Sequence, residues 1–194
     1  MAKYDNICKH VHLPVQSGSS AVLERMNRGY SREWYLNRIA AIKRILPTSS
    51  ITTDIIIGFC GETEEEHQET LSLMDDVQFD FAYMYKYSER PKTLAERKFQ
   101  DDIPETVKQR RLEEVIEKQH FYGLQKNQKS IGDIYEVLVE NVSKKSQEEM
   151  GGRNTQNKVI IFPRMNVKKG DFTHVKITDC TKATLIGKII STNN

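Results

Sequence analysis

The sequence predicts an α/β protein whose alternating strands and helices are followed by a long charged helix and then by a small β-barrel. Apolar runs alternate with helical patterns through the first half of the chain, which is typical of a parallel sheet, either open or part of a barrel. Short alternating segments separated by Gly, Asn and Lys-rich turns follow Gly132, and they indicate antiparallel strands. We therefore expect a sheet domain at residues 1–102, a linker helix at 103–130 and a small antiparallel barrel at 131–194.

Each element of the first domain follows from a local pattern. Residues 10–16 alternate apolar and polar side chains, which predicts a strand. Apolar residues recur at helical spacing over 31–46, and Pro47 ends that helix. The run at 51–59 is apolar on both faces near its end, as expected of a strand covered by helices. An acidic first turn at Glu62-Thr63 opens a helix that ends near Val77, and a third strand follows at 79–87.

The second half is more polar. A charged amphipathic helix is predicted between Pro104 and about Lys129. We expect Phe162 and Phe172 to lie in the core of the barrel that follows. The predicted barrel strands are 135–139, 158–162, 171–177 and 184–190.

Composition limits the classes of function. The chain of 194 residues is 38% hydrophobic and 29% charged, and no apolar run is long enough for a membrane span. No signal-peptide pattern opens the sequence, so we expect a cytoplasmic protein with reduced cysteines and no membrane partner. Cys8, Cys60 and Cys180 are too far apart in sequence for a metal cluster, so no metal site is predicted. The net charge is +2, but the segment after residue 130 holds 10 Lys and Arg against 7 Asp and Glu, which makes the tail the basic part.

Several blocks, in order along the chain, resemble the radical-SAM methylthiotransferase family, in particular the tRNA 2-methylthio-N6-dimethylallyladenosine synthases. The last block is similar to the TRAM domain that ends these enzymes, so the resemblance covers nearly the whole chain. One departure is Cys60, where the family usually has proline; we interpret it as an inert turn cysteine. The blocks are CKHVHLPVQSGS at 8–19, MNRGY at 26–30, TDIIIGF at 53–59, GET at 61–63, YKYSERP at 85–91 and GRNTQNK at 152–158.

The resemblance implies a partial (β/α) radical-SAM barrel followed by an OB-like TRAM barrel. It also implies that the full enzyme adds a methylthio group to C2 of N6-isopentenyl-adenosine at tRNA position 37, using S-adenosylmethionine and two 4Fe-4S clusters. The Cys-x3-Cys-x2-Cys cluster of the family is absent here. We therefore expect no catalytic or cluster-binding residue in this chain, which would be inactive alone. The implied partners are a tRNA anticodon stem-loop and a missing N-terminal half.

Two other functions remain open at this point. The chain is either part of that enzyme or an RNA-binding module that works without catalysis. A sister methylthiotransferase acting on threonylcarbamoyl-adenosine in tRNA or on a ribosomal protein is the third reading, which the LPVQSG block at 13–18 disfavours.

Ligands of a parallel barrel bind at the carboxyl ends of its strands, which predicts five cofactor-binding residues. Gln16, Ser17 and Gly58 follow strands directly, although a glycine there is also an ordinary turn residue. Asp54 lies inside the second strand, where it either positions S-adenosylmethionine or makes a structural hydrogen bond. Arg28 either pairs with the carboxylate of the cofactor or is solvated.

Basic residues in two regions are predicted to contact RNA. After the third strand, Lys86 and Arg90 either face the substrate or form a solvated rim. In the barrel, the predicted phosphate contacts surround the loops and would make binding sensitive to salt. These barrel residues are Lys144, Lys145, Arg153, Asn157 and Lys158.

Overall fold

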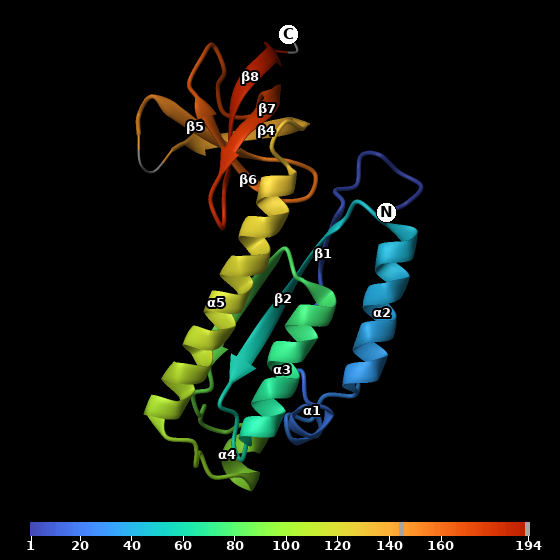
Figure 1. Ribbon diagram of the computed structural model, residues 1–194, viewed down its shortest axis with the longest axis vertical. Coiled ribbons are helices and arrows are strands. Elements are labelled where there is room, and N and C mark those ends of the chain that lie inside the picture. The colour runs from blue at the N-terminus through green and yellow to red at the C-terminus, as the bar shows by residue number, and fades with distance from the viewer. Residues whose placement is uncertain (144–145, 193–194) are drawn as a thin grey trace. The chain divides into compact units, whose positions relative to one another are not determined.

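The computed structural model describes residues 1–143 and 146–192. Its strands form a three-stranded sheet and a closed five-stranded barrel (Figure 1). The chain forms two units: one contains residues 11–47 and 51–119, and the other contains residues 1–10, 48–50 and 120–194. The fold class predicted from the sequence is confirmed.

The sheet has the order β1-β2-β3, and β2 pairs with β3 in parallel, with Thr52 opposite Phe81 and Ile56 opposite Tyr85. The strand expected at 10–16 is shorter in the structure, because Pro14 has no N–H to donate and only an isolated bridge from Gln16 to Ile55 continues the pairing. The strands are β1 (His10–His12), β2 (Ser50–Ile57) and β3 (Phe81–Lys86). The helices are α1 (Ser20–Arg25), α2 (Arg32–Ile45), α3 (Glu64–Val77), α4 (Leu94–Lys98) and α5 (Glu105–Lys129).

The helices begin where the sequence provides caps. The Ser31 side chain accepts a hydrogen bond from Trp34 N–H at the start of α2. At the start of α3, Thr63 and Glu66 form a reciprocal capping box that fixes the end of the preceding turn. The predicted helices at 31–46 and from Glu62-Thr63 to Val77 are thereby confirmed within a residue or two at each end.

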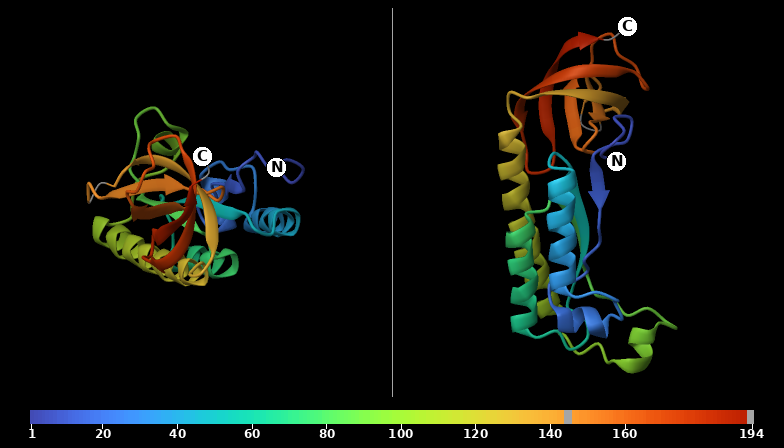
Figure 2. Two further views of the ribbon diagram at one scale, coloured as in Figure 1. Left: turned by 90° about the horizontal axis from the view of Figure 1, so that it is seen from above. Right: turned by 90° about the vertical axis from the view of Figure 1, so that its right-hand side faces the viewer.

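Helices cover one face of the sheet and leave the other open. On the covered face, Ile55 and Ile57 pack with Tyr35 of α2, Leu73 of α3 and Val115 of α5 in a single core, and these helices lie on the same side of the sheet in Figure 2. On the other face, the β3 side chains alternate outward. Phe81, Tyr83 and Tyr85 are 39%, 49% and 53% exposed.

The barrel has the strand order β4-β5-β6-β8-β7, which is the order of an OB fold. The sequence predicted an antiparallel barrel of four strands, and this was wrong in two respects. The β6–β8 pair is parallel, and a fifth strand, β5, contains Gly151 and Gly152, which hide its alternation. The strands are β4 (Ile134–Val142), β5 (Glu149–Arg153), β6 (Val159–Pro163), β7 (Phe172–Cys180) and β8 (Leu185–Thr192).

Of the two phenylalanines that we expected in the barrel core, one lies there. Phe162 is buried, but Phe172 is 51% exposed. The reason is the two-residue period of β7, which directs Thr173, Val175 and Ile177 inward and therefore Phe172 outward.

We predict that Gly152→Ala destabilises the barrel. A β-carbon at Gly152 would lie 2.4 Å from the Leu138 carbonyl oxygen, which is backbone and cannot move away cheaply. The expected loss of unfolding free energy is about 1–3 kcal/mol, measured by chemical denaturation. Gly29→Ala is the control, because a β-carbon there meets no atom within 4 Å. Equal stability of the two variants would contradict the close packing.

Candidate functional site

The turns after β1 and β2 bring three of the five predicted cofactor-binding residues, Gln16, Ser17 and Gly58, to the carboxyl end of the sheet. Gln16 has a positive φ of 73°, its N–H donates to the Asp54 carbonyl at 2.9 Å, and its carbonyl accepts from Ile56 N–H at 2.8 Å. Ser17 is fully buried, with its Oγ 3.3 Å from the Thr70 hydroxyl. Backbone pairing therefore holds Gln16 in the sheet, and the Ser17 side chain joins its turn to α3.

Gly58 lies in the turn after β2 with a φ of +72°. A β-carbon there would lie 2.4 Å from Cγ of Lys108, so the side chain of α5 fills the space beside this glycine. The Gly58 N–H donates to Glu62 Oε2 at 2.7 Å. Glycine is needed at this position for both its backbone angle and its contact with Lys108.

Glu62 and Arg111 form a buried ion pair that connects this turn to α5. Arg111 donates to the Glu62 carboxylate and to its backbone carbonyl, both at 2.9 Å, and both residues are at least 95% buried. Burial raises the pKa of Glu62, whereas the Gly58 N–H and Arg111 act in the opposite direction. The neighbouring Lys108 Nζ reaches both oxygens of Asp101, at 2.6 and 2.7 Å.

Three residues near this pair have the composition of a metal site. Glu64, His67 and Glu114 place one possible ligand atom each within 4.8 Å of one another. Arginines already neutralise the carboxylates, because Arg110 bonds to Glu64 and Glu114, and Arg111 also bonds to Glu64. The hydrogen bond from Arg110 lowers the pKa of Glu64 to about 2. The cluster is thus an ion-pair network between α3 and α5.

Two of the predicted cofactor-binding residues are accessible. The Asp54 side chain is 30% exposed on the open face of the sheet, and its carboxylate lies 3.6 Å from Nε2 of His12. Asp54 is therefore only partly buried, because no helix of the described residues covers this face. Arg28 is exposed, and its guanidinium has no hydrogen bond or ion pair among residues 1–143 and 146–192.

The residues expected to contact RNA after β3 differ in their surroundings. Lys86 hydrogen-bonds to Glu105, and to Gln109 at 3.1 Å, so α5 engages its ammonium group. Arg90 is exposed in the loop after the strand. Cys60 is buried against Phe59 and Val22, and burial raises the pKa of its thiol, which supports the interpretation of an inert turn cysteine.

In the barrel, three of the five predicted RNA contacts can be examined. Arg153 donates to Glu140 at 3.2 Å and to the carbonyl and side-chain oxygens of Asn157 at 3.1 and 3.0 Å. Lys158 donates to Oδ1 of Asn127 at 3.3 Å. Lys144 and Lys145 lie outside the described residues. The loop at 153–158 is therefore rigidly bonded, and its cations are already partly engaged.

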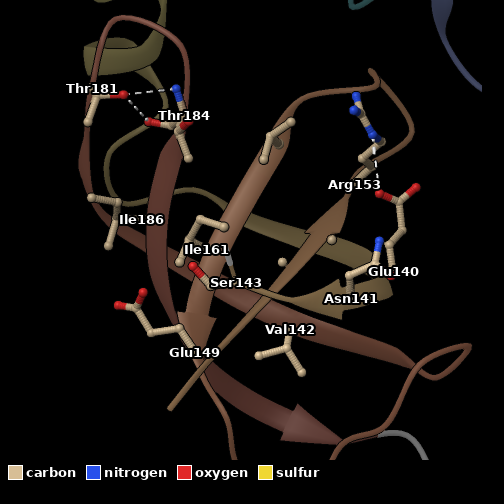
Figure 3. Close-up of a pocket in the computed structure, with 13 residues that line it drawn as sticks. Glu140, Asn141, Val142, Ser143, Glu149, Arg153, Ile161, Thr181, Thr184 and Ile186 are labelled. Carbon is tan, nitrogen blue, oxygen red and sulfur yellow. Dashed lines mark hydrogen bonds and ion pairs between the residues drawn. The ribbon is translucent and has the colours of Figure 1, made fainter. Parts of the chain in front are cut away.

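The sequence did not predict a groove of about 690 Å³ on the outer side of β5 and β6 (Figure 3). Its floor is apolar, with Ile161 and Ile186 beside Gly151, while hydroxyl and carboxylate side chains form its rim. The groove lies on the face that OB folds use for nucleic acids, beside the β4–β5 and β7–β8 loops. The lining residues are Glu140, Asn141, Val142, Ser143, Glu149, Gly151, Gly152, Arg153, Val159, Ile161, Thr181, Thr184 and Ile186.

The only signals in the sequence for this groove are the adjacent Gly151-Gly152 and the two threonines at 181 and 184. Thr181 Oγ1 accepts from the N–H groups of Ala183 and Thr184 and donates to the Thr184 carbonyl, which closes the β7–β8 loop. Such a turn can be recognised in a sequence, but its position beside β5 depends on barrel closure.

Fold and site together define the class of protein. Residues 1–74 match the Radical SAM superfamily, and residues 128–190 match the TRAM domain. The chain therefore contains one segment similar to radical SAM domains and, after it, one segment similar to TRAM domains.

The particular relatives are named tRNA-2-methylthio-N(6)-dimethylallyladenosine synthase. The protein from Amoebophilus asiaticus is 57% identical over 96% of this chain and 38% of its own length. The proteins from Phocaeicola vulgatus and Flavobacterium johnsoniae are 54% and 53% identical, over 97% and 98% of this chain and 41% and 40% of their own lengths. The chain is thus homologous to these synthases and spans about two fifths of their length.

One solved structure also shows some likeness. The solution structure of a conserved protein from Methanococcus maripaludis is 25% identical and covers 31% of this chain and 79% of its own length. Its TM-score of 0.26 is too low to establish a common fold. Separately, no helix within residues 1–143 and 146–192 is both long and apolar enough to cross a membrane.

We predict that Arg111→Met destabilises the chain by about 3–5 kcal/mol, because it leaves the Glu62 carboxylate buried without its cation. Adding Glu62→Gln should recover part of that loss, since the amide still accepts from Gly58 N–H without a charge. Thermal and chemical unfolding measure both effects. Arg110→Met, on the exposed side of the same helix, is the control and should change stability little. An Arg111→Met variant as stable as this control would contradict the role of the buried pair.

Proposed function

We propose that this chain is the part of a tRNA methylthiotransferase that contributes one edge of the S-adenosylmethionine site and an RNA-binding barrel. The reaction is the addition of a methylthio group to C2 of N6-isopentenyl-adenosine at tRNA position 37. The supporting observation is the likeness to named synthases, which covers 96–98% of this chain at 53–57% identity. The activity belongs in the cytoplasm, where tRNA is modified.

The residues at the carboxyl end of the sheet suit S-adenosylmethionine, which when bound supplies the radical chemistry of the superfamily. Asp54 and Arg28 expose a carboxylate and a guanidinium that can pair with the amino and carboxylate groups of the cofactor. Gln16 lies at the same edge, where its backbone hydrogen bonds to Asp54 and Ile56 fix its position. Ser17 and Gly58 act through the turns that they shape, because Thr70 and Lys108 occupy their surroundings.

The cysteines do not suit an iron-sulfur cluster. Cys60 is buried in an apolar group, Cys8 is exposed, and Cys180 is half-buried in the barrel. A 4Fe-4S cluster needs several thiolates around one site. We therefore assign no cluster ligand to this chain and propose that a complementary N-terminal half supplies them.

The barrel is proposed to hold the anticodon stem-loop of the substrate. The groove of the OB-type face supports this role, and so does Arg153 in its lining. The other proposed RNA contacts are Lys144, Lys145, Asn157 and Lys158. Lys86 at the end of β3 and Arg90 in the loop after it are proposed to contact the same RNA. We keep the division into a half-barrel at 1–102, a linker at 103–130 and a TRAM barrel at 131–194.

A chimera tests the transferase assignment. In the Amoebophilus asiaticus relative, the matching 187-residue segment is replaced by the corresponding part of this chain. We expect methylthiolation of tRNA, detected by mass spectrometry of its nucleosides, because 57% identity preserves the fold. A folded chimera that binds S-adenosylmethionine and tRNA but makes no product would favour an RNA-binding module without catalysis. Product on threonylcarbamoyl-adenosine or on a ribosomal protein would indicate a sister enzyme.

Salt-dependent titration tests the RNA assignment. The purified chain should bind an anticodon stem-loop that carries isopentenyl-adenosine more tightly than an unrelated hairpin, and more weakly as salt rises. Arg153→Gln should weaken binding and reduce the slope of log affinity against log salt by about 0.7–0.9, the contribution of one phosphate contact. Arg44→Gln, which removes one exposed charge from α2, is the control. Identical slopes for the two variants would remove Arg153 from the interface.

A further inference from the structure

The groove of the barrel has chemistry that does not suit phosphate. Among the described residues, its lining includes the carboxylates of Glu140 and Glu149 and one cation, Arg153. Glu140 and Asn157 already engage that cation. Glu149 makes no side-chain hydrogen bond or ion pair within the part of the chain that the structure describes. A phosphate placed here would be repelled by the Glu149 carboxylate, with which no cation of the described residues pairs.

The same features suit a nucleobase. Glu149, Gly151 and Arg153 alternate along the outer side of β5, and Ile161 lies opposite Gly151. Gly151 adds no side chain to the floor, and Cδ1 of Ile161 lies 3.2 Å from where its β-carbon would stand, so the flat face of a base can pack on the Ile161 and Ile186 side chains (Figure 3). The volume of about 690 Å³ falls within the range of small-ligand pockets, which is ample for one nucleoside.

The carboxylate of Glu149 determines which bases fit. It accepts hydrogen bonds and donates none when ionised. The amino groups of adenine, cytosine and guanine donate to such an acceptor, whereas uracil offers only its N3–H, which is flanked by two carbonyl oxygens that a carboxylate repels. A positively charged peptide is the main alternative occupant, but the apolar floor offers it no specific contact.

We propose that the groove between β5, β6 and the β7–β8 loop holds one unpaired, amino-bearing base of the RNA, with Glu149 accepting from the amino group. The phosphates on either side stay outside, near the basic rim. This inference rests on the proposed RNA-binding function and adds base selection to it. Glu149 is a specificity-determining residue in this assignment.

Short single-stranded RNAs test the proposal on the full chain. Hexamers of adenosine, cytidine and uridine are titrated at one salt concentration, and amide spectra follow Gly151 and Thr184. We expect adenosine and cytidine hexamers to bind about 5- to 10-fold more tightly than the uridine hexamer, as one good base contact provides. They should also shift both amide signals.

Glu149→Gln should bring the three affinities within about twofold of one another, since an amide both donates to uracil and accepts from amino groups. Glu148→Gln is the matched control, because it removes the same charge from the neighbouring exposed position outside the groove. It should keep the preference for amino-bearing bases.

The possible outcomes distinguish a failure of base selection from a failure of the proposed RNA-binding function. RNA binding with no base preference, or a preference that Glu149→Gln leaves unchanged, overturns base selection while RNA binding stands. No binding of any hexamer or of the anticodon stem-loop overturns both. Shifts at Gly151 and Thr184 caused by hexalysine but not by RNA would assign the groove to a basic peptide and also overturn the inference.

Discussion

The buried pair of Glu62 and Arg111 holds together the end of the sheet where the proposed cofactor site lies. Glu62 accepts at one oxygen from both Gly58 N–H and Arg111, so a single carboxylate fixes the turn after β2 and its attachment to α5. Burying two charges costs several kcal/mol of desolvation, which only close geometry on both partners offsets. Such a pair adds little stability over an apolar contact but permits one arrangement only. The positions of Gly58 and of Lys108 beside it follow from this constraint.

The open face of the sheet explains why the remaining site residues are accessible. Parallel sheets normally have both faces covered, yet Asp54 and the aromatic row of β3 face outward here. In a complete (β/α) barrel, side chains in these positions would point into its interior. Asp54 is therefore available to a polar ligand. Ser17 is buried, and its hydroxyl bonds to Thr70 of α3.

Patterns along the chain predicted the helices and strands better than the tertiary contacts between them. The helix at 32–45 followed from apolar spacing, its Ser31 cap and Pro47, all of which are local. The β5 strand was missed because its two glycines carry no side chain to alternate, and the exposure of Phe172 was missed because a large apolar residue does not reveal which face of a strand it occupies. The contact of Glu62 with Arg111 joins residues 49 positions apart. Helical periodicity indicates on which face of α5 Arg111 lies, but only tertiary packing brings it into contact with Glu62.

The net charge of a segment likewise does not reveal the charges at one site within it. The excess of basic residues after residue 130 predicted phosphate contacts, and long-range attraction of RNA depends on that excess. Within the barrel, however, Arg153 pairs with Glu140, Lys158 bonds to the amide oxygen of Asn127, and no cation of the described residues pairs with Glu149 in the groove. In the proposed assignment, attraction and selection are therefore carried by different residues. The basic residues would attract the phosphate backbone, while Glu149 in the apolar groove would accept only from a part of the nucleotide that can donate a hydrogen bond.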